Sequence, residues 1–399
     1  MGLKKQQGKT VQFDYTALDC VISNQAVADA LLAIVEKDDR QAVFLAASAS
    51  LSAATGEFAD IQNALGGRFA GFFTGVGSHT PRKDVMKVLA AAREAEADVL
   101  VSLGGGSIID ACKTVQLAMD QDIHSEQQLL EYAQLADGTR GPKYADYSLL
   151  SANSAVRQIA VPTTLSGGEF SNNAGVLNSE TSAKEGYRGI NLCPKSIIYD
   201  PQLSVHTPEW LWLSTAIRSL DHAVEGYCSA DSHPFLDGHF LHAMTLFSRS
   251  LPVTKKKPND LAARNLSQQA VWLACCGLGT VAHGASHGIG YILGSLCAVP
   301  HGFTSCVMLP AVLEWNSQTE SENQQGIAAA LGQENATAAE AVASLIAGLE
   351  LPRSLRDVGV SSDQLDEIAK RAIRHPVVRR NPRELHSADQ IMEILEIAW

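Results

Sequence analysis

A glycine triplet, Gly104 to Gly106, follows an apolar run and precedes Ser107 and a helical pattern. Glycine has no side chain, so a backbone built from it can approach a bound group closely, and the first N–H groups of a helix favour negative charge. Gly105 and Gly106 are therefore candidate contacts for the pyrophosphate of a dinucleotide, and Ser107 adds a hydroxyl donor. The alternative is a tight strand-to-helix turn that binds no ligand.

Two charged residues that follow this loop, and one serine at the end of an earlier strand, are further candidates for cofactor contacts. Asp110 and Lys113 lie one helical turn apart, so they either pair on the helix surface or hold the loop and reach the cofactor. The second strand of the chain ends in Ala46-Ala47-Ser48, where a Rossmann enzyme strict for NAD usually presents an acid to the adenosine ribose. Because Ser48 leaves room for a 2′-phosphate, we expect NADPH use or use of both coenzymes.

Composition limits the partners of the chain. Its 399 residues are 46% hydrophobic and 19% charged, which suits a large core and two domains. The formal charge of -12 argues against a nucleic-acid or anionic-membrane partner, since either favours a basic surface. We expect a small-molecule substrate, and an anionic one would need local arginines.

Cysteine usage and hydropathy indicate the compartment. The eight cysteines include no CxxC pair and several lie in apolar stretches, which is typical of buried thiols in a reducing environment. No targeting segment is visible at the N-terminus. The most apolar region, 271–299, contains two histidines and several glycines, so we interpret it as a buried helix pair and not as a membrane span. These features favour a cytoplasmic protein.

Hydrophobic patterns alternate between strand and helix in the first half of the chain. Such an order predicts a doubly wound α/β domain with a Rossmann-like parallel sheet. A polar segment, 118–157, should contain one helix near 125–135, and from Pro208 onward the pattern is helical. We therefore expect an α/β dinucleotide-binding domain at 1–205 and an all-helical domain at 206–399. The predicted strands are 41–47, 97–103, 159–161 and 196–199, and the predicted helices are 24–37 and 82–95.

Several motifs together resemble the iron-containing alcohol dehydrogenase superfamily. GGGSIIDACK, residues 104–113, matches the GGGSxxDxxK pattern of that family. SHTP at 78–81 and PTTLSGGEFS at 162–171 are similar to MHVP and PTTYAGSEMT of its maleylacetate reductase branch. Further matching blocks occur at 199–201, 221–225, 300–302 and 381–383. The resemblance implies a dehydroquinate synthase-like architecture, an active site in the cleft between the two domains, and a homodimer.

The resemblance also implies cofactor contacts. In the family the Thr-Thr loop lies beside the nicotinamide cofactor, which points to Thr163 and Thr164 here, with Gly168, Glu169 and Ser171 nearby. The alternative is a strand-end turn without a ligand.

Family members hold Fe²⁺ or Zn²⁺ with an aspartate, a histidine four residues later, and two further histidines fourteen residues apart. His222, His287 and His301 fall on the histidine positions, and imidazole suits such metals. His283 lies four residues before His287, so these two are a competing pair of ligands. The spacing from His287 to His301 favours the first set, and we expect a structural role for His283.

Arg218 differs from the residue that the family has at this position of the metal site. It stands four residues before His222, where dehydrogenases have aspartate and maleylacetate reductases commonly have asparagine. A guanidinium repels a cation and offers no lone pair, so we expect weak metal binding or none. Arg218 would then replace the metal by binding a substrate carboxylate or a developing oxyanion. The alternative is that it pairs with Asp221 or Glu225 and points away from the cleft.

The resulting hypothesis is NAD(P)H-dependent reduction of a small keto or enone substrate that carries a carboxylate, as in maleylacetate to 3-oxoadipate. Arg218 would anchor the substrate, and Tyr291, His79 or His222 would supply the proton. Tyr291 stands where many relatives have another active-site histidine. Three alternatives remain open: a metal-dependent alcohol dehydrogenase, a non-redox relative that catalyses cyclisation or dehydration in a biosynthetic pathway, and a non-catalytic nucleotide-binding protein.

Overall fold

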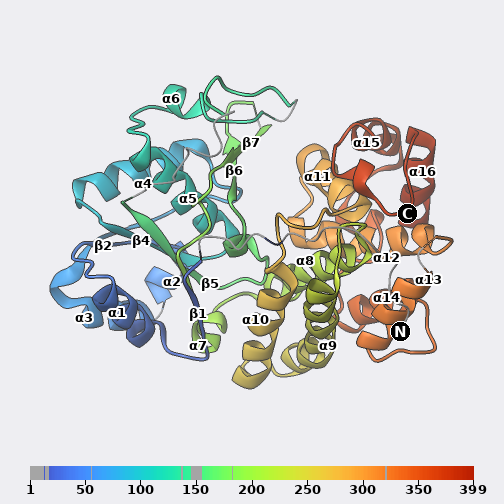
Figure 1. Cartoon of the computed structure of the whole chain (residues 1–399), viewed down its shortest axis with the longest axis horizontal. Helices are drawn as coiled ribbons and strands as arrows, with labels where there is room; N and C mark the ends of the chain where they lie inside the picture. The colour runs from blue at the N-terminus through green and yellow to red at the C-terminus, as the bar shows by residue number, and fades with distance from the viewer. Residues whose placement is uncertain are drawn as a thin grey trace. The chain divides into compact units, whose positions relative to one another are not determined.

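The computed structural model describes residues 13, 18–54, 56–135, 138–144, 155–181, 183–319 and 321–399. Internal contacts divide the chain into two compact units (Figure 1). Tyr15–Thr207 form the α/β unit, and Pro208–Trp399 belong to the helical unit. The division falls between Thr207 and Pro208; whether 1–205 and 206–399 fold as separate domains remains a prediction.

The α/β unit is built on a six-stranded parallel sheet with the order β1-β8-β5-β4-β2-β3. The predicted α/β class with a parallel sheet is confirmed. The strands nearest the middle of the sheet are buried along most of their length, which explains why the sequence showed them as continuous apolar runs. The strands are β1 (Cys20–Ser23), β2 (Val43–Ala47), β3 (Phe69–Thr74), β4 (Val99–Gly104), β5 (Arg157–Pro162) and β8 (Ser196–Tyr199).

Helices cover both faces of this sheet. On β2, Val43 and Leu45 belong to one apolar cluster, while Phe44 and Ala46 belong to another, because successive side chains of a strand point to opposite faces. The first cluster contains residues of α1 (Val27–Lys37) and α3 (Gly56–Leu65); the second contains α4 (Arg82–Glu94) and α5 (Gly106–Asp120). Figure 1 shows these two pairs of helices in blue and in cyan to teal. The short helices of this unit are α2 (Ala49–Ala54), α6 (Glu126–Leu130) and α7 (Pro201–Ser204).

The segment after α5 differs from the prediction. The helix expected at 125–135 is only α6, which begins after its cap Ser125 and ends at Leu130. It ends there because Gln134 exchanges backbone hydrogen bonds with Gly186, which requires an extended chain. Gly186 lies on a hairpin that the sequence did not reveal, formed by antiparallel strands β6 (Asn173–Asn178) and β7 (Ala183–Arg188). Residues 145–154 of the polar segment lie outside the described residues.

The helical unit is organised around α8 (Glu209–Cys228), most of whose residues are buried. It packs against α9, α10, α11 and α12, and no strand occurs in the parts of 208–399 that the structure describes. A second core joins α11 and α12 to α15 and α16. The remaining helices are α9 (Pro234–Lys256), α10 (Leu261–Cys275), α11 (Ala285–Cys297), α12 (His301–Asn316), α13 (Ser321–Ala330), α14 (Ala338–Gly348), α15 (Leu365–Ala372) and α16 (Ala388–Ile397).

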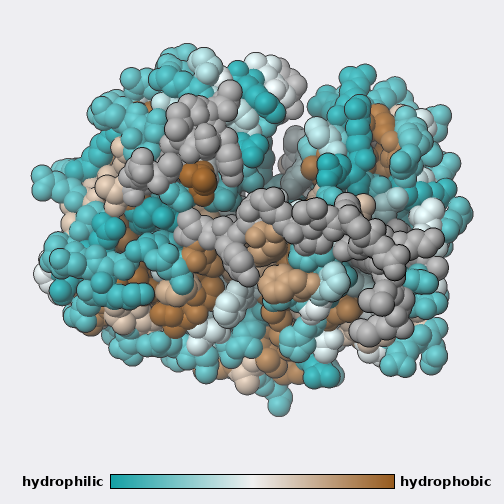
Figure 2. All heavy atoms as spheres, viewed as in Figure 1, coloured by the Kyte–Doolittle hydropathy of each residue, from teal (hydrophilic) through white to brown (hydrophobic). Residues whose placement is uncertain are grey.

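Hydrophilic residues dominate the face drawn in Figure 2, with smaller hydrophobic patches between them. The eight cysteines are free thiols. Among the described helices, none combines the length and the apolar character that crossing a bilayer requires. The predicted buried helix pair in 271–299 corresponds to the end of α10 and to α11.

Candidate functional site

The glycine loop joins β4 to α5. Gly105 is the N-cap of α5 and has no side chain to cap the helix, so the first backbone N–H groups are left to other partners. A Cβ atom on Gly105 would lie 2.9 Å from Thr164 Cγ2, and one on Gly106 would lie 3.4 Å from Ser166 Oγ. A side chain at Gly105 would thus collide with Thr164, so the loop packs closely against the segment that follows β5. The uncapped start of α5 supports the expectation of a pyrophosphate site, which stays a prediction.

Thr163 and Thr164 lie beside this loop, at the end of β5. The N–H of Thr163 donates to the carbonyl oxygen of Gly104 (3.0 Å), and the Thr207 hydroxyl donates to the carbonyl oxygen of Thr163 (2.6 Å). Both threonine side chains are buried. The structure thus brings the two segments predicted to hold the cofactor next to each other.

Ser48 and His79 border the same loop. Ser48 donates its backbone N–H to the carbonyl oxygen of Leu103 (3.0 Å). His79 has a left-handed backbone (φ 63°) and donates its N–H to the Ser107 hydroxyl (3.1 Å). Burial, and then the charge of Lys184, lower the pKa of His79. The Ser107 side chain therefore holds the His79 segment in addition to being a candidate phosphate donor.

Lys113, on α5, binds the segment from Gly168 to Asn173. Its buried ammonium donates to the carbonyl oxygens of Gly168 (2.6 Å) and Asn173 (2.9 Å) and to the Ser171 hydroxyl (3.0 Å). Asp110 accepts a hydrogen bond from the N–H of Gly175 (3.0 Å). These contacts are to the segment that follows β5 and not to the glycine loop, so neither of the two roles left open describes them. Asp110 and Ser171, which were expected to contact the cofactor, are also bound to protein here.

Glu169, in the same segment, is buried and accepts a hydrogen bond from the Tyr199 hydroxyl (2.6 Å). Burial raises the pKa of this carboxyl. Glu169 thus connects the η2 turn (Gly168–Phe170) to β8.

In the helical unit, Arg218 lies inside the protein. Its side chain is on α8, the residue is 6% exposed, and its Nη1 donates to Ser305 Oγ on α12 (3.1 Å). Its Cζ lies 5.4 Å from the ring centre of Tyr291 on α11. Asp221 Oδ2 is 3.9 Å from Arg218 Nη1, a long ion pair, because this oxygen accepts closer hydrogen bonds from Ser286 and Ser305. Part of the alternative is therefore seen, since Arg218 lies near Asp221, while its direction relative to the cleft stays a prediction.

Three imidazoles gather beside Arg218. His222 Nδ1 lies 2.9 Å from His283 Nε2, and the ring of His287 lies 4.4 and 4.2 Å from these two rings, between ring centres. One ligand atom from each histidine falls within 4.8 Å of the others. His301, at the start of α12, is not in this group, whereas His283, for which a structural role was expected, is in it. The interval of fourteen residues from His287 to His301 had favoured His301 as a ligand. Because α11 begins at Ala285, His283 lies in the loop before the helix, and from there its ring contacts His222.

A second group contains Asp221, Glu225 and His287. Glu225 accepts hydrogen bonds from the backbone N–H groups of Gly284 (2.9 Å), Ser286 (2.8 Å) and His287 (3.3 Å). Burial, and then the neighbouring Asp221 carboxylate, raise the pKa of Glu225 to about 8, although these hydrogen bonds act to lower it. Glu225 was not among the site residues expected from the sequence, although it belongs to the matching block at 221–225. Its oxygens cap a helix, so this group does not resemble an open metal site.

The family's metal does not fit its usual ligand set here. Arg218 occupies the aspartate position and has no lone pair to donate. Burial, with the positive charge of Arg218 as a further cause, lowers the pKa values of His222, His283 and His287. The same positive charge that disfavours imidazolium disfavours a divalent cation at the three imidazoles.

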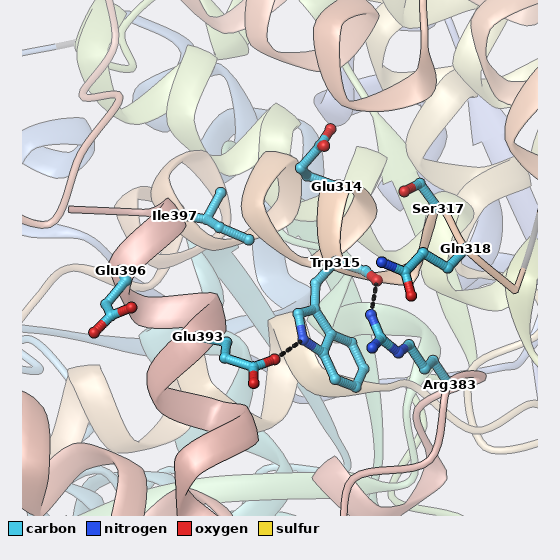
Figure 3. Close-up of a pocket in the computed structure, with 8 residues that line it drawn as sticks. All are labelled: Glu314, Trp315, Ser317, Gln318, Arg383, Glu393, Glu396 and Ile397. Atoms are coloured by element: carbon cyan, nitrogen blue, oxygen red, sulfur yellow. Dashed lines mark hydrogen bonds between the residues drawn. The ribbon is translucent and has the colours of Figure 1, made fainter.

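A separate hollow in the helical unit, of about 480 Å³, does not contain any of these residues (Figure 3). Arg383, from the matching block at 381–383, donates to the carbonyl oxygen of Trp315 (2.5 Å) and lies 3.7 Å from the centre of its ring. Trp315 Nε1 donates to Glu393 (2.9 Å). Arg383 is thus engaged in packing α12 against the C-terminal segment. The lining residues are Glu314, Trp315, Ser317, Gln318, Arg383, Glu393, Glu396 and Ile397.

Comparison with known proteins identifies the family of the chain. Residues 20–201 match the family described as iron-containing alcohol dehydrogenase, and residues 212–399 match the C-terminal part of the Fe-containing alcohol dehydrogenase family. The chain is 32% identical to dehydrogenase ALT3 of Alternaria alternata over 89% of its own length and 98% of that protein.

Two further relatives are informative. Maleylacetate reductase 1 of Rhodococcus opacus is 28% identical and covers 85% of this chain and 83% of its own. The crystal structure of sulfoacetaldehyde reductase from Bifidobacterium kashiwanohense in complex with NAD⁺ shares the fold, with a TM-score of 0.85, 20% identity, and coverage of 98% and 99% of the two chains. The chain therefore belongs to the iron-containing alcohol dehydrogenase family and is an oxidoreductase.

Proposed function

We propose that this protein is an NAD(P)H-dependent reductase of a small keto or enone substrate that carries a carboxylate. The observation that carries the proposal is the buried Arg218 guanidinium, which has five N–H donors but donates a hydrogen bond only to Ser305 within the described chain. A guanidinium binds carboxylates and phosphates with two parallel hydrogen bonds. Its position beside three neutral imidazoles favours an anion there.

The coenzyme would be held by the α/β unit. Gly105 and Gly106 offer backbone close to Thr164 and Ser166, and Thr163 lies next to them. Ser48 has no charge to repel a 2′-phosphate, which supports NADPH as well as NADH. When bound, the nicotinamide supplies the hydride. The similar reductase structure that contains NAD⁺ supports this assignment.

The chain's own groups would bind the substrate and supply the proton. Arg218 anchors the carboxylate or stabilises the developing oxyanion, and Tyr291 donates a proton to the carbonyl oxygen. Tyr291 is favoured because its ring lies against the guanidinium and its side chain is 38% exposed. His222 is less suitable, since its Nδ1 is engaged with His283 and its lowered pKa keeps it neutral. The lowered pKa of His79 has the same effect.

Relatives named maleylacetate reductase support a carboxylate-bearing substrate. The proposal includes a homodimer, as in the family, and a cytoplasmic location, as the free thiols suggest.

The test uses purified full-length protein and a panel of keto acids with matched neutral ketones. We expect NADH or NADPH oxidation with a keto acid, and calorimetric binding of at least one of the two coenzymes. Turnover without net coenzyme oxidation would show a non-redox relative. Failure of both coenzymes to bind would overturn the proposal altogether.

A further inference from the structure

The N-terminus of α11 is capped by a side chain from another helix. Its N-cap residue, Gly284, has no side chain, so the first N–H groups of the helix lack a local acceptor. Glu225 of α8 supplies one, and its two oxygens accept hydrogen bonds from the N–H groups of Gly284, Ser286 and His287. This carboxylate therefore fixes where α11 begins and, with it, the backbone of His287.

Glu225 also fixes the ring of His287. His287 Nδ1 lies 2.7 Å from Glu225 Oε2. Backbone N–H groups can only donate, so three such bonds show that both carboxylate oxygens act as acceptors. When Glu225 is ionised, it can only accept, so the fourth partner, Nδ1, carries the proton and donates it to Oε2. In a neutral imidazole this leaves the lone pair on Nε2.

The Nε2 atom of His287 is a buried acceptor. The residue is fully buried, and within the described chain this atom has no hydrogen-bond partner. His222 and His283, the neighbouring imidazoles, satisfy each other through a 2.9 Å contact. A buried polar atom without a partner costs about 1–3 kcal/mol, so such an atom is usually kept for a ligand or a water molecule.

Arg218 lies on the same side of α11. A Cβ atom on Gly290 would be 3.7 Å from Arg218 Nη1, so the small residue three positions after His287 allows the guanidinium to approach the helix. Asp221 Oδ2 is 3.9 Å from Arg218 Nη1 and 3.5 Å from His287 Nδ1. The guanidinium, which can donate hydrogen bonds to an anion, therefore lies close to the helix segment that carries His287.

We propose that Glu225 is a positioning residue that presents His287 Nε2 as the hydrogen-bond acceptor for the hydroxyl of a hydroxy acid whose carboxylate binds Arg218. This inference rests on the proposed function and adds the polar group that recognises the alcohol form of the substrate. A transition metal could use the same lone pair, but the adjacent guanidinium disfavours it.

The first test measures the tautomer directly. Nitrogen NMR of histidine-labelled full-length protein at about pH 9, above the Glu225 pKa of about 8, should show a neutral imidazole with its proton on Nδ1 whose signal is absent in His287→Gln. Zinc should leave the signal unchanged. A His287 with its proton on Nε2, or a zinc-induced shift of its Nε2, would overturn the assignment. This arm requires no change at Glu225 and no substrate.

The second test separates positioning from structure. We expect Glu225→Gln to lower kcat about 10–100-fold, as loss of an orienting carboxylate does. Coenzyme affinity should stay unchanged, because the glycine loop belongs to the α/β unit. Glu209→Gln, on the exposed first turn of the same helix, is the matched control. Equal kcat values in Glu225→Gln and wild type would overturn the positioning role.

The two proposals can fail separately. A wild-type protein that binds coenzyme but oxidises none with any keto acid overturns the proposed function and the hydroxyl assignment together. A protein that reduces keto acids but shows the other His287 tautomer overturns only the role of Glu225.

Discussion

Ser305 Oγ accepts a hydrogen bond from Arg218 Nη1 (3.1 Å) and donates one to Asp221 Oδ2 (2.6 Å), so one hydroxyl lies between a buried cation and a buried anion. The two charged groups consequently stay 3.9 Å apart and do not form a close ion pair. A guanidinium that lacks a tight internal carboxylate retains donors for a carboxylate from outside. This relationship, which joins α8 to α12, underlies the assignment of Arg218.

Replacement of Arg218 should damage substrate binding. A hydrogen bond to a charged group is worth about 1.5–3 kcal/mol, so we expect Arg218→Gln to lower kcat/KM for a keto acid about 10–150-fold. Arg218→Lys should recover little, because an ammonium does not form two parallel hydrogen bonds. Arg371→Gln, on the exposed surface of α15, is the control. Steady-state kinetics with a keto acid and its neutral analogue decide the matter, and an equal loss for both would contradict carboxylate recognition.

An aspartate at position 218 should restore metal binding. Arg218→Asp removes the cation and supplies a carboxylate four residues before His222, as in metal-dependent relatives. We expect this variant to bind zinc stoichiometrically, while the wild type purified without chelator does not and keeps its activity in EDTA. Elemental analysis and activity before and after chelation provide the measurement. A stoichiometric, catalytically required metal in the wild type would identify a metal-dependent alcohol dehydrogenase instead.

The sequence predicted those elements whose signal is local. The strand that ends at Gly104 is a continuous apolar run, and the glycine triplet after it marks the turn into α5. The edge strand β3 escaped detection because its exposure alternates and Gly71 interrupts the pattern. The polar strand β7 escaped it as well. Its Glu185 is buried through an ion pair with Arg82 (2.7 Å), a contact across the fold that no local pattern reveals.

The site was predictable only in part, for the same reason. Spacing identified His222 and His287, which the structure brings together. It also selected His301 over His283, because a fixed interval of fourteen residues carries no information about the loop before α11. The contact between Glu225 on α8 and His287 on α11 joins two residues that are sixty-two positions apart in the sequence. Only the packing of α8 against α11 could show it.

The glycine loop should not tolerate a side chain at Gly105. In Gly105→Ala the new Cβ would lie 2.9 Å from Thr164 Cγ2, so the loop or Thr164 must move and the backbone N–H groups shift. We expect coenzyme affinity, measured by calorimetry, to fall about 10-fold or more, as loss of one good hydrogen bond would do. Gly67→Ala, where nothing lies within 4 Å, should leave affinity unchanged. Equal coenzyme affinity in both variants would contradict the loop's role.

Coenzyme preference should respond to charge at Ser48. An aspartate there would stand where NAD-specific enzymes place an acid, repelling a 2′-phosphate and accepting from a ribose hydroxyl. We expect Ser48→Asp to lower kcat/KM for NADPH about 10-fold while that for NADH is retained or rises. Ser48→Asn, similar in size and uncharged, separates charge from volume. If the aspartate and asparagine variants show the same coenzyme ratio, Ser48 does not face the ribose.

Acid should destabilise the protein through its buried imidazoles. Burial, and then Arg218, lower the pKa of His283 to about 3, whereas an unfolded histidine titrates near ~6.5. The pKa of His283 is lower in the folded than in the unfolded protein, so the unfolded protein binds this proton first as the pH falls. The free energy of unfolding is therefore unaffected by His283 above ~6.5 and falls by about 1.4 kcal/mol per pH unit between that value and the folded pKa. The raised pKa values of Asp221 and Glu225 act in the opposite direction, so the variant must be compared with wild type. We expect urea unfolding of His283→Gln to depend less on pH between about 7 and 5 than that of wild type, while the exposed His386→Gln behaves like wild type. Parallel pH profiles for His283→Gln and wild type would show that this imidazole does not titrate on unfolding.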